Sequence, residues 1–378
     1  MQIYVFYIQY FNPKSLKFNL INVYFCSVVY IKMNFTQTLT YWYSVNKRDL
    51  PWRKSKDPYK IWLSEIIMQQ TQIKQGMPYY ETFVDKFPTI FDLALANEEQ
   101  VLKLWQGLGY YSRARNLHYT AKHIANDLDG VFPKDYNSLL KLKGVGDYTA
   151  SAIASICYDK PTAVVDGNVY RVLARYYGIE TPINSAKGIK YFKELAQSLL
   201  PKNKTGNYNQ AIMDFGSRQC KPKSPDCSTC PLNNSCVSLK NKLVSTLPIK
   251  INKTKVSKKH INFLVIISND HKTILEKRTK NGIWKNLYQF PLVETKTRLE
   301  LNDFKENEGI NKVLNDNEYS ISRYNDIEIV HKLSHQHLFT TFWIVKVDSV
   351  SDLGLSILRI HEFPVPVLIS RFIEDFGF

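Results

Sequence analysis

The spacing of apolar residues along the chain changes from a helical period to a strand period near residue 260. Before that point apolar positions recur every three to four residues, as in amphipathic helices. The helices predicted from this pattern cover Tyr59–Lys74, Phe91–Leu104, Tyr136–Lys143, Ala150–Tyr158 and Tyr208–Gly216. After it, the pattern predicts strands at 263–267, 273–275 and 287–292, helical material at 299–314 and a long hairpin at 328–347. We therefore predict a mainly α domain followed by an α+β domain.

Two glycines separate the predicted helix that ends at Lys143 from one that starts at Asp147. Gly144 and Gly146 flank one apolar residue and allow a tight hairpin. Its backbone N–H groups would point outward at the start of the next helix, an arrangement that suits a phosphate. An ordinary glycine-closed turn between packed helices is the alternative. An apolar, strand-like run then leads to Asp166, an acid that could lie over a sugar of a bound strand.

Glu65 is an acid within an apolar part of the first predicted helix. Its neighbours include Ile61, Trp62, Ile66, Ile67 and Met68. Burial among such groups disfavours the ionised carboxyl and favours the neutral form that a general acid needs at neutral pH. Most glutamates on amphipathic helices face solvent, and that is the alternative.

Four of the six cysteines lie within 17 residues, in the pattern Cys220-x6-Cys227-x2-Cys230-x5-Cys236. Cysteines so few and so clustered do not form the disulfide framework of a secreted protein. Four thiolates in a compact loop can hold zinc or an iron–sulfur cluster. Structural zinc sites usually contain two close pairs of ligands separated by a long spacer, whereas this loop has one close pair and two outliers.

Composition indicates a nucleic-acid partner. The 378 residues suffice for two domains with cores of their own. Fifty Lys and Arg against 34 Asp and Glu give a net charge of +16 and a pI near 9.3. This balance is typical of nucleic-acid binders, although other basic proteins share it.

Two segments lie outside the predicted domains. Residues 1–32 are rich in Tyr, Phe, Ile and Val and contain no acid. Their longest apolar run, Val23–Ile31, is too short to span a bilayer, and the features of a signal peptide are missing. We interpret Met33 as the start of the functional chain and residues 1–32 as an extension of doubtful status. Residues 238–260, with seven lysines and no acid, are predicted to form a basic linker.

Two further stretches combine groups that can contact nucleic acid. Gly107–Asn116 contains glycines, adjacent tyrosines and two arginines, a mixture that suits base stacking and phosphate contact. A buried tyrosine pair with surface arginines is the alternative. Ser334 and His335 occupy the expected tip of the long hairpin, beside Leu333. Alone, they describe an ordinary hairpin tip.

Taken together, Leu142–Ala150 and Val164–Val169 resemble the helix-hairpin-helix and Gly/Pro-Asp element of the endonuclease III superfamily of DNA glycosylases. Bifunctional lyases of that superfamily carry a lysine two residues after the second glycine, where this chain has Tyr148. The difference indicates the monofunctional branch, the MutY family of adenine DNA glycosylases. Trp62–Gln72 resembles the catalytic helix of that family. The resemblance covers about residues 34 to 375.

The resemblance implies roles for four residues in catalysis. Glu65 would protonate the adenine leaving group. Asp166 would stabilise the positive charge on the sugar or capture it covalently, and the sequence leaves both routes open. Tyr148 would order the site through its hydroxyl, and Asn168 would hold a water or Asp166. The cysteine spacing matches the [4Fe–4S] loop of the superfamily, so Cys220, Cys227, Cys230 and Cys236 are the expected cluster ligands.

The resemblance also implies DNA contacts. Tyr110 would wedge into the duplex, with Gln70 supporting it from the minor groove. Gln210 would present its amide to adenine, which suits that base because an amide donates and accepts one hydrogen bond at once. The expected DNA-binding residues are Arg53, Gln70, Tyr110, Gly144, Gly146, Gln210, Ser334 and His335.

The second predicted domain resembles the Nudix-like C-terminal domain of the same family. Gly282–Pro291 fits a motif of that domain, but the R-E-x-x-E-E box of metal-dependent Nudix hydrolases is missing, so pyrophosphate hydrolysis is not expected. The family turn H-x-F-S-H, which reaches the base opposite adenine, corresponds to His331–His335 with Leu333 in place of Phe. Stacking on the lesion is therefore expected to be weaker.

The sequence thus predicts a monofunctional glycosylase that excises adenine opposite 8-oxoguanine or guanine in base excision repair. A catalytically idle DNA- or nucleotide-binding protein on the same scaffold is the alternative; it would have lost Glu65 or Asp166, and both are present. A lyase of the endonuclease III type is disfavoured by Tyr148. We expect a monomer that binds mispaired duplex DNA, without a membrane, in a bacterial cytoplasm or nucleoid. The expected domains are the glycosylase with its cluster loop at 33–237, the linker at 238–260 and the lesion-recognition domain at 261–378.

Overall fold

The computed structural model describes residues 33–251, 256–314, 318–350 and 354–378. The predictions about residues 1–32, including the start at Met33, lie outside these residues. The chain divides into two compact units. Of the described residues, the first unit contains 33–61, 134–141 and 145–251; the second contains 62–133, 142–144 and those from 256 onward. None of the helices in the described ranges has the length and apolar content of a membrane span.

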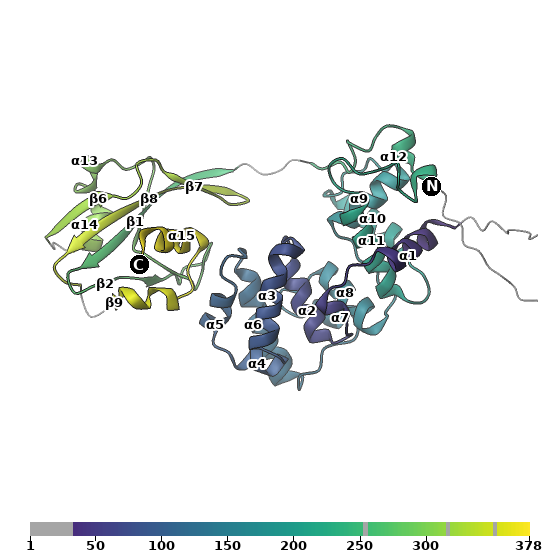
Figure 1. Ribbon diagram of the computed structural model, residues 1–378, viewed down its shortest axis with the longest axis horizontal. Coiled ribbons are helices and arrows are strands. Elements are labelled where there is room, and N and C mark those ends of the chain that lie inside the picture. The colour runs from purple at the N-terminus through teal and green to yellow at the C-terminus, as the bar shows by residue number, and fades with distance from the viewer. Residues whose placement is uncertain (1–32, 252–255, 315–317, 351–353) are drawn as a thin grey trace, which may run out of the picture. The chain divides into compact units, whose positions relative to one another are not determined.

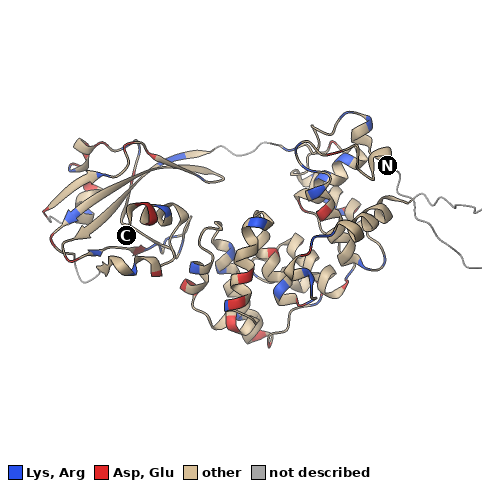
Figure 2. Cartoon of the chain, in the orientation of Figure 1, with Lys and Arg blue, Asp and Glu red and all other residues tan. Residues whose placement is uncertain are grey.

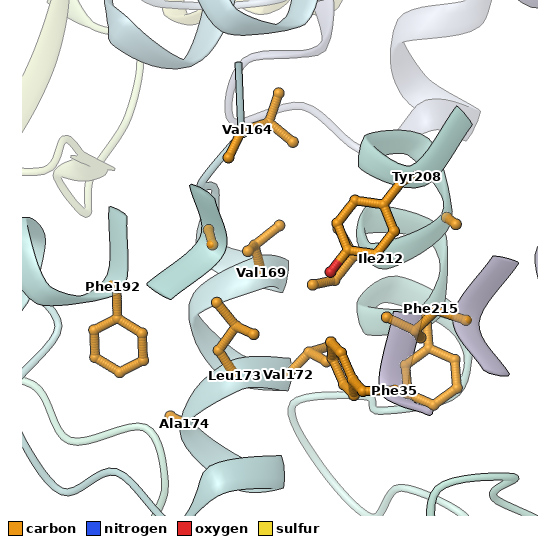
Figure 3. Close-up of a cluster of buried hydrophobic side chains, with 14 of the residues drawn as sticks. Phe35, Val164, Val169, Val172, Leu173, Ala174, Phe192, Tyr208, Ile212 and Phe215 are labelled. Carbon is orange, nitrogen blue, oxygen red and sulfur yellow. The ribbon is translucent and has the colours of Figure 1, made fainter. Parts of the chain in front are cut away.

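The first unit is helical. Its core is formed by apolar side chains of several helices, among them Phe35, Leu173, Phe192 and Phe215 (Figure 3). Asn34 caps the first helix in a capping box with Gln37, which fixes where that helix begins. The helices are α1 (Phe35–Asn46), α7 (Tyr136–Leu140), α8 (Asp147–Tyr158), α9 (Gly167–Tyr177), α10 (Ala186–Ser198), α11 (Thr205–Arg218) and α12 (Val237–Lys240), with short 3-10 turns at Pro51–Arg53 and Asn233–Ser235.

The second unit combines helices with a sheet (Figure 1). Acidic and basic residues both occur in each of the two units (Figure 2). The helices before the sheet are α2 (Pro58–Met68, from Trp62 onward), α3 (Ile73–Lys86), α4 (Ile90–Leu95), α5 (Glu98–Leu104) and α6 (Ser112–Asp127).

Two helix predictions were too long. The helix predicted over Tyr59–Lys74 ends at Met68, because Gln70 takes a left-handed backbone with φ of 56°. Arg113 of α6 donates to the carbonyl oxygens of Ile66 and Ile67 and so satisfies the end of α2. The helix predicted over Phe91–Leu104 is divided into α4 and α5. Asn97 causes the break by capping α5 in a capping box with Gln100.

The run that leads to Asp166 is not a strand. Side chains take the place of a neighbouring strand there: Gln197 Oε1 accepts from the N–H of Ala163 at 3.0 Å. The Asn209 side chain accepts from the N–H of Val164 at 3.3 Å and donates to the carbonyl of Thr162 at 2.8 Å. The apolar pattern was identified correctly, since Ala163 and Val164 are buried, but polar groups of α10 and α11 satisfy the backbone.

A sheet forms the centre of the C-terminal part of the second unit. Strand β1 (Ser257–Ser268) pairs in parallel with β8 (Gln336–Val347) along its whole length and antiparallel with β5 (Leu292–Thr295). The sheet order is β6-β8-β1-β2-β9, with β5 on β1 and β7 on β8. The remaining strands are β2 (Lys272–Thr273), β3 (Glu276–Lys277), β4 (Tyr288–Gln289), β6 (Tyr319–Arg323), β7 (Ile329–Lys332) and β9 (Leu355–Ser356). Helices α13 (Leu301–Phe304), α14 (Glu308–Leu314) and α15 (Val367–Phe376) and the 3-10 turn Ile357–Glu362 complete this part.

Helices cover both faces of this sheet. On one face Leu264 and Trp343 pack with Phe304 of α13 and Ile310 of α14. On the other, the ring of Phe342 stacks on that of Phe372 of α15, with ring centroids 4.1 Å apart. This double covering explains why β1 is buried without alternation from Ile261 to Ile266. The predicted fold class, a mainly α part followed by an α+β part with a long hairpin, is confirmed.

Candidate active site and nucleic-acid interface

Glu65 lies in the last turns of α2. Ile61, Trp62, Ile66 and Ile67 around it are buried, and Glu65 itself is half-buried. The predicted apolar surroundings of this acid are therefore present. The Arg113 guanidinium, which donates to carbonyl groups at the end of the helix, also donates to the carbonyl of Gln69 and so holds the segment after Met68.

Asp166 is the N-cap of α9. Its Oδ1 accepts from the backbone N–H of Asn168 at 2.9 Å and of Val169 at 2.8 Å. Its Oδ2 accepts from Asn168 Nδ2 at 2.7 Å. Burial raises the pKa of Asp166 above its ordinary value, and the hydrogen bonds from Val169 and Asn168 oppose that rise only in part. All three partners donate, so these hydrogen bonds match the ionised carboxylate and oppose the effect of burial.

Asn168 connects Asp166 to a buried arginine. Its Oδ1 accepts from Arg171 Nη2 at 2.7 Å. Arg171 also donates to the carbonyls of Cys220 at 2.7 Å and Gly216 at 2.6 Å. Because a Cβ on Gly216 would lie 2.7 Å from the Cβ of Asn168, only glycine lets α11 approach the start of α9 this closely. Of the two roles predicted for Asn168, the structure contains the contact with Asp166.

The hydroxyl of Tyr148, on α8, donates to the sulfur of Met213 at 3.4 Å. Met213 lies on α11, between Gln210 and Asp214 in sequence. Within the first unit, Tyr148 is therefore placed against the helix that also carries Gln210. The expectation that Tyr148 orders the site around Asp166 stays a prediction.

The glycine hairpin has the predicted backbone. Gly144 takes φ of 82°, and Gly146 is the extended N-cap of α8. Thr120 donates to the carbonyl of Lys143 at 2.7 Å and ties the turn to α6. At the start of α8, Asp147 accepts from Tyr136 of α7 and forms an ion pair with Lys193 of α10. These contacts fix where the amide groups of the hairpin point.

Gln210 is half-buried on α11, and its Oε1 accepts from the Tyr43 hydroxyl of α1 at 2.5 Å. One turn further along α11, the fully buried Asp214 binds two arginines. Arg53 reaches both its oxygens, at 2.8 and 2.9 Å, and Arg48 donates to Oδ1. Arg53, a predicted DNA-binding residue, is thus held by Asp214.

Sequence reasoning did not select Tyr43, Arg48 or Asp214. The available signal was weak: an acid one helical turn after Gln210, inside the apolar run Ala-Ile-Met-Asp-Phe. Two arginines around Leu50-Pro-Trp in the N-terminal part gave no indication that they share one carboxyl.

Two predicted DNA-binding residues of the second unit have strained backbones. Gln70 is exposed and left-handed, and Tyr110 is exposed by 51% with φ of 47°. The Arg113 guanidinium lies 5.7 Å from the centre of the Tyr110 ring and 5.1 Å from that of Trp105. The Tyr110 hydroxyl is 2.6 Å from Ser334 Oγ.

The tip between β7 and β8 presents Ser334 and His335 to solvent. The N–H of Leu333 donates to the carbonyl of Gln336 at 2.9 Å and closes the turn. The N–H of Ser257 donates to the carbonyl of His335 at 3.1 Å. The predicted hairpin and its exposed polar tip are therefore present, and the structure adds the contact between Ser334 and Tyr110.

The four clustered cysteines line one cavity, together with Arg175. The Arg175 guanidinium donates to Cys220 Sγ at 3.5 Å and to the carbonyl of Lys221 at 2.7 Å. Burial and the neighbouring thiols raise the pKa of Cys230 to about 12. In the described residues, no three His, Cys, Asp or Glu side chains lie close enough to hold one metal ion. The four thiols thus share one cavity, and the cluster expected there stays a prediction.

Comparison with known proteins matches both parts of the chain. The family described as "HhH-GPD superfamily base excision DNA repair protein" matches residues 63–198, and the NUDIX domain family matches residues 262–375. An adenine DNA glycosylase of Buchnera aphidicola subsp. Baizongia pistaciae is 37% identical over 314 residues, which cover 82% of this chain and 86% of the relative. The adenine DNA glycosylase of Buchnera aphidicola subsp. Schizaphis graminum is 39% identical over 265 residues, 70% of this chain and 76% of that protein.

Among solved structures, a thermostable thymine-DNA glycosylase superposes with a TM-score of 0.51 at 31% identity. The match covers 55% of this chain and 95% of that structure. The likeness supports a shared fold over about half of this chain.

Proposed function

Because the chain belongs to the adenine DNA glycosylase family, we propose that it hydrolyses the N-glycosidic bond of adenine in DNA, within base excision repair. Its specific substrate is adenine mispaired with 8-oxoguanine or guanine. The observation that carries the proposal is the carboxylate of Asp166, held at the start of α9 by three N–H donors. An ionised carboxylate held in this way would stabilise a cationic sugar, and this supports the proposal.

The first chemical step is protonation of the base. To be reached, adenine leaves the stack, which costs a few kcal/mol and least at a mispair. Glu65 donates a proton to the leaving base, and its half-buried place among apolar side chains supports this role. Positive charge then develops on the sugar.

Asp166 stabilises that charge, and a water completes the hydrolysis. The contact from Asn168 keeps one carboxylate oxygen oriented. Tyr148 occupies the position at which lyases of the superfamily carry a lysine. Without that amine no Schiff base forms with the sugar, so the enzyme is monofunctional and leaves the strand intact.

DNA binding involves both units. The amides at Gly144 and Gly146, at the start of α8, bind a phosphate, and Arg53 and Gln70 contact the duplex. Tyr110 enters the base stack next to the lesion. Ser334 and His335 read the base opposite adenine; their exposure at the hairpin tip supports this role.

Cys220, Cys227, Cys230 and Cys236 hold a [4Fe–4S] cluster. Their common cavity and the buried Arg175 beside Cys220 support the assignment. When bound, the cluster crosslinks the loop. Lys221 and Lys223 are exposed on that loop and contact the DNA backbone. Analysis of iron and sulfide in anaerobically purified protein tests this assignment, and stoichiometric zinc without iron would reject it.

The activity is tested with duplexes that contain adenine opposite 8-oxoguanine, guanine or thymine. We expect excision from the two mispairs, with strand breaks only after alkali or heat. Glu65→Gln should lower the single-turnover rate by about 10²-fold or more while duplex binding persists. Asp135→Asn, which retains the cap of α7, is the matched control and should excise normally.

Several outcomes would reject parts of this proposal. Absence of excision by the wild-type protein would reject the activity itself. Covalent trapping of a stoichiometric protein–DNA adduct by borohydride would contradict the monofunctional route. Near-native turnover of Glu65→Gln would remove Glu65 from the mechanism.

A further inference from the structure

The side-chain amide of Gln210 has one fixed partner. The Tyr43 hydroxyl approaches its Oε1 to 2.5 Å. Within the described residues, this is the hydrogen bond that the Gln210 side chain makes, and Gln210 is only half-buried. Its second amide end therefore remains available to a ligand.

The Tyr43 hydroxyl needs an acceptor at this place. Its side chain is only 7% exposed, so water has little access to it. The nearby carboxylate of Asp214 is already occupied, because Arg48 and Arg53 donate to its oxygens. Burial raises the pKa of Tyr43, so the phenol carries its proton at neutral pH. Gln210 Oε1 is the acceptor for that proton in the described structure.

Because the Tyr43 hydroxyl requires an acceptor, it determines the orientation of the Gln210 side-chain amide. If the amide were turned over, its N–H group would face the phenol oxygen and the buried phenolic hydrogen would lose its acceptor. An unsatisfied buried donor is disfavoured more than a hydrogen bond is favoured. The observed orientation is therefore the stable one, with Nε2 directed away from Tyr43 and one lone pair of Oε1 still open.

We infer that Tyr43 is a positioning residue that sets the orientation of the Gln210 amide and thereby the preference for adenine over other purines. The inference rests on the proposed function, together with the role that the family resemblance implies for Gln210, which is to present its amide to the flipped-out adenine. A fixed amide offers one donor and one acceptor side by side. Adenine presents the complementary pair, N7 as acceptor and the 6-amino group as donor, whereas guanine presents two acceptors.

The surroundings of Tyr43 support a positioning role. Arg53 lies 5.6 Å from the centre of the Tyr43 ring and is itself held by Asp214. Asp214 and Gln210 lie one turn apart on α11. The ring, the guanidinium and the carboxylate pack against one another, and this packing keeps the hydroxyl directed at α11.

The test combines one change in the enzyme with one change in the substrate, as in a double-mutant cycle. Wild type and Tyr43→Phe are compared on duplexes with adenine or purine at the target position, opposite 8-oxoguanine. Purine lacks the 6-amino group and so cannot use the oriented Oε1. We expect Tyr43→Phe to lower the adenine-to-purine ratio of single-turnover rates by about three- to tenfold. Duplex affinity should be unchanged.

Two controls test whether the effect comes from the Tyr43 hydroxyl and whether it acts through Gln210. Tyr41→Phe changes a partly exposed tyrosine on the same helix, makes the same chemical change, and should leave the ratio as in wild type. In a Gln210→Ala background, Tyr43→Phe should have no further effect on the ratio. Tyr43→Phe keeps the ring that packs in the core, so its melting temperature should stay close to that of wild type.

An unchanged ratio in an active Tyr43→Phe enzyme would overturn the inference. So would an equal fall in Tyr41→Phe, or a further fall in the Gln210→Ala background. Absence of adenine excision by wild type would instead reject the proposed function. The failures of the two ideas are thus distinct.

Discussion

Asp214 and Asp166 are both carboxyls held by hydrogen bonds in the first unit, but their partners differ in charge. Asp214 is fully buried and binds the guanidinium groups of Arg48 and Arg53. Asp166 binds two backbone N–H groups and an amide, and the guanidinium of Arg171 is connected to it through Asn168. One acid is neutralised by charge and the other mainly by dipoles.

The pKa values follow this difference in opposite directions. Burial pushes the pKa of Asp214 up, but Arg53 and Arg48 outweigh burial and leave the pKa below its ordinary value. Burial raises the pKa of Asp166, and its neutral partners do not fully offset it. The ionised Asp214 therefore stabilises the fold at neutral pH, and that contribution is lost as the pH falls through its lowered pKa. Ionised Asp166 costs stability at neutral pH, and that cost disappears as the pH falls through its raised pKa.

The comparison separates a structural acid from a reactive one. A carboxylate with two guanidinium partners has its charge already compensated and gains little from a new cation. A carboxylate held mainly by dipoles keeps more of its charge uncompensated and can stabilise a cationic sugar. The first unit places both kinds within two neighbouring helices, α9 and α11.

Removal of the structural acid should have the largest effect. Asp214→Ala leaves Arg48 and Arg53 without their common partner, and we expect the free energy of unfolding to fall by about 3–5 kcal/mol. Chemical denaturation measures this change. The triple substitution Arg48→Met, Arg53→Met and Asp214→Leu should recover part of this loss. A loss below about 1 kcal/mol would show that the ion pairs contribute as little as exposed ones.

Removal of the reactive acid should affect rate more than stability. Asn is as good an N-cap as Asp, so Asp166→Asn should change the free energy of unfolding by about 1 kcal/mol or less. The single-turnover rate should fall by about 10²–10³-fold, because the charge that stabilises the sugar is gone. Quenched-flow excision and denaturation of the same preparation test both parts. If Asp166→Asn lost as much stability as Asp214→Ala but kept its excision rate, Asp166 would be the structural acid and not the reactive one.

Removal of the Asn168 side chain should have a smaller effect, which appears in the pH dependence of the single-turnover excision rate. The hydrogen bond from Asn168 lowers the pKa of Asp166. Its removal in Asn168→Ala should move the acid limb of the single-turnover rate to higher pH, since the carboxylate is then protonated more easily. A pH–rate profile at saturating enzyme measures this shift, with Asn207→Ala, an exposed asparagine on α11, as control. A shift to lower pH would contradict the role of Asn168.

The sequence predicted those features that depend on local pattern. Gly144 and Gly146 indicate a hairpin. Gly144 takes φ of 82°, a backbone that glycine adopts most easily, whereas Gly146 is extended. The apolar neighbours of Glu65 indicate a half-buried acid, which the structure contains. The strand pattern of 328–347 indicates a hairpin, and β7 and β8 form it.

Features that depend on distant partners were not predictable. The end of α2 is satisfied by Arg113, 46 and 47 positions from Ile67 and Ile66, so nothing near Met68 indicated the break. The apolar run before Asp166 looked like a strand because its polar partners, Gln197 and Asn209, lie on other helices. Tyr43 and Gln210 are 167 positions apart, and only the packing of α1 on α11 brings them together.

The left-handed backbones of Gln70 and Tyr110 have a consequence for protein engineering. For residues with a Cβ, this conformation costs about 1–2 kcal/mol relative to the ordinary one. A designer seeking a more heat-resistant variant would normally place glycine at both positions, and the backbone would accept it. That choice would delete the amide and the phenol that extend from the surface toward DNA in the proposed function. At positions 70 and 110, therefore, higher stability and higher activity require different residues.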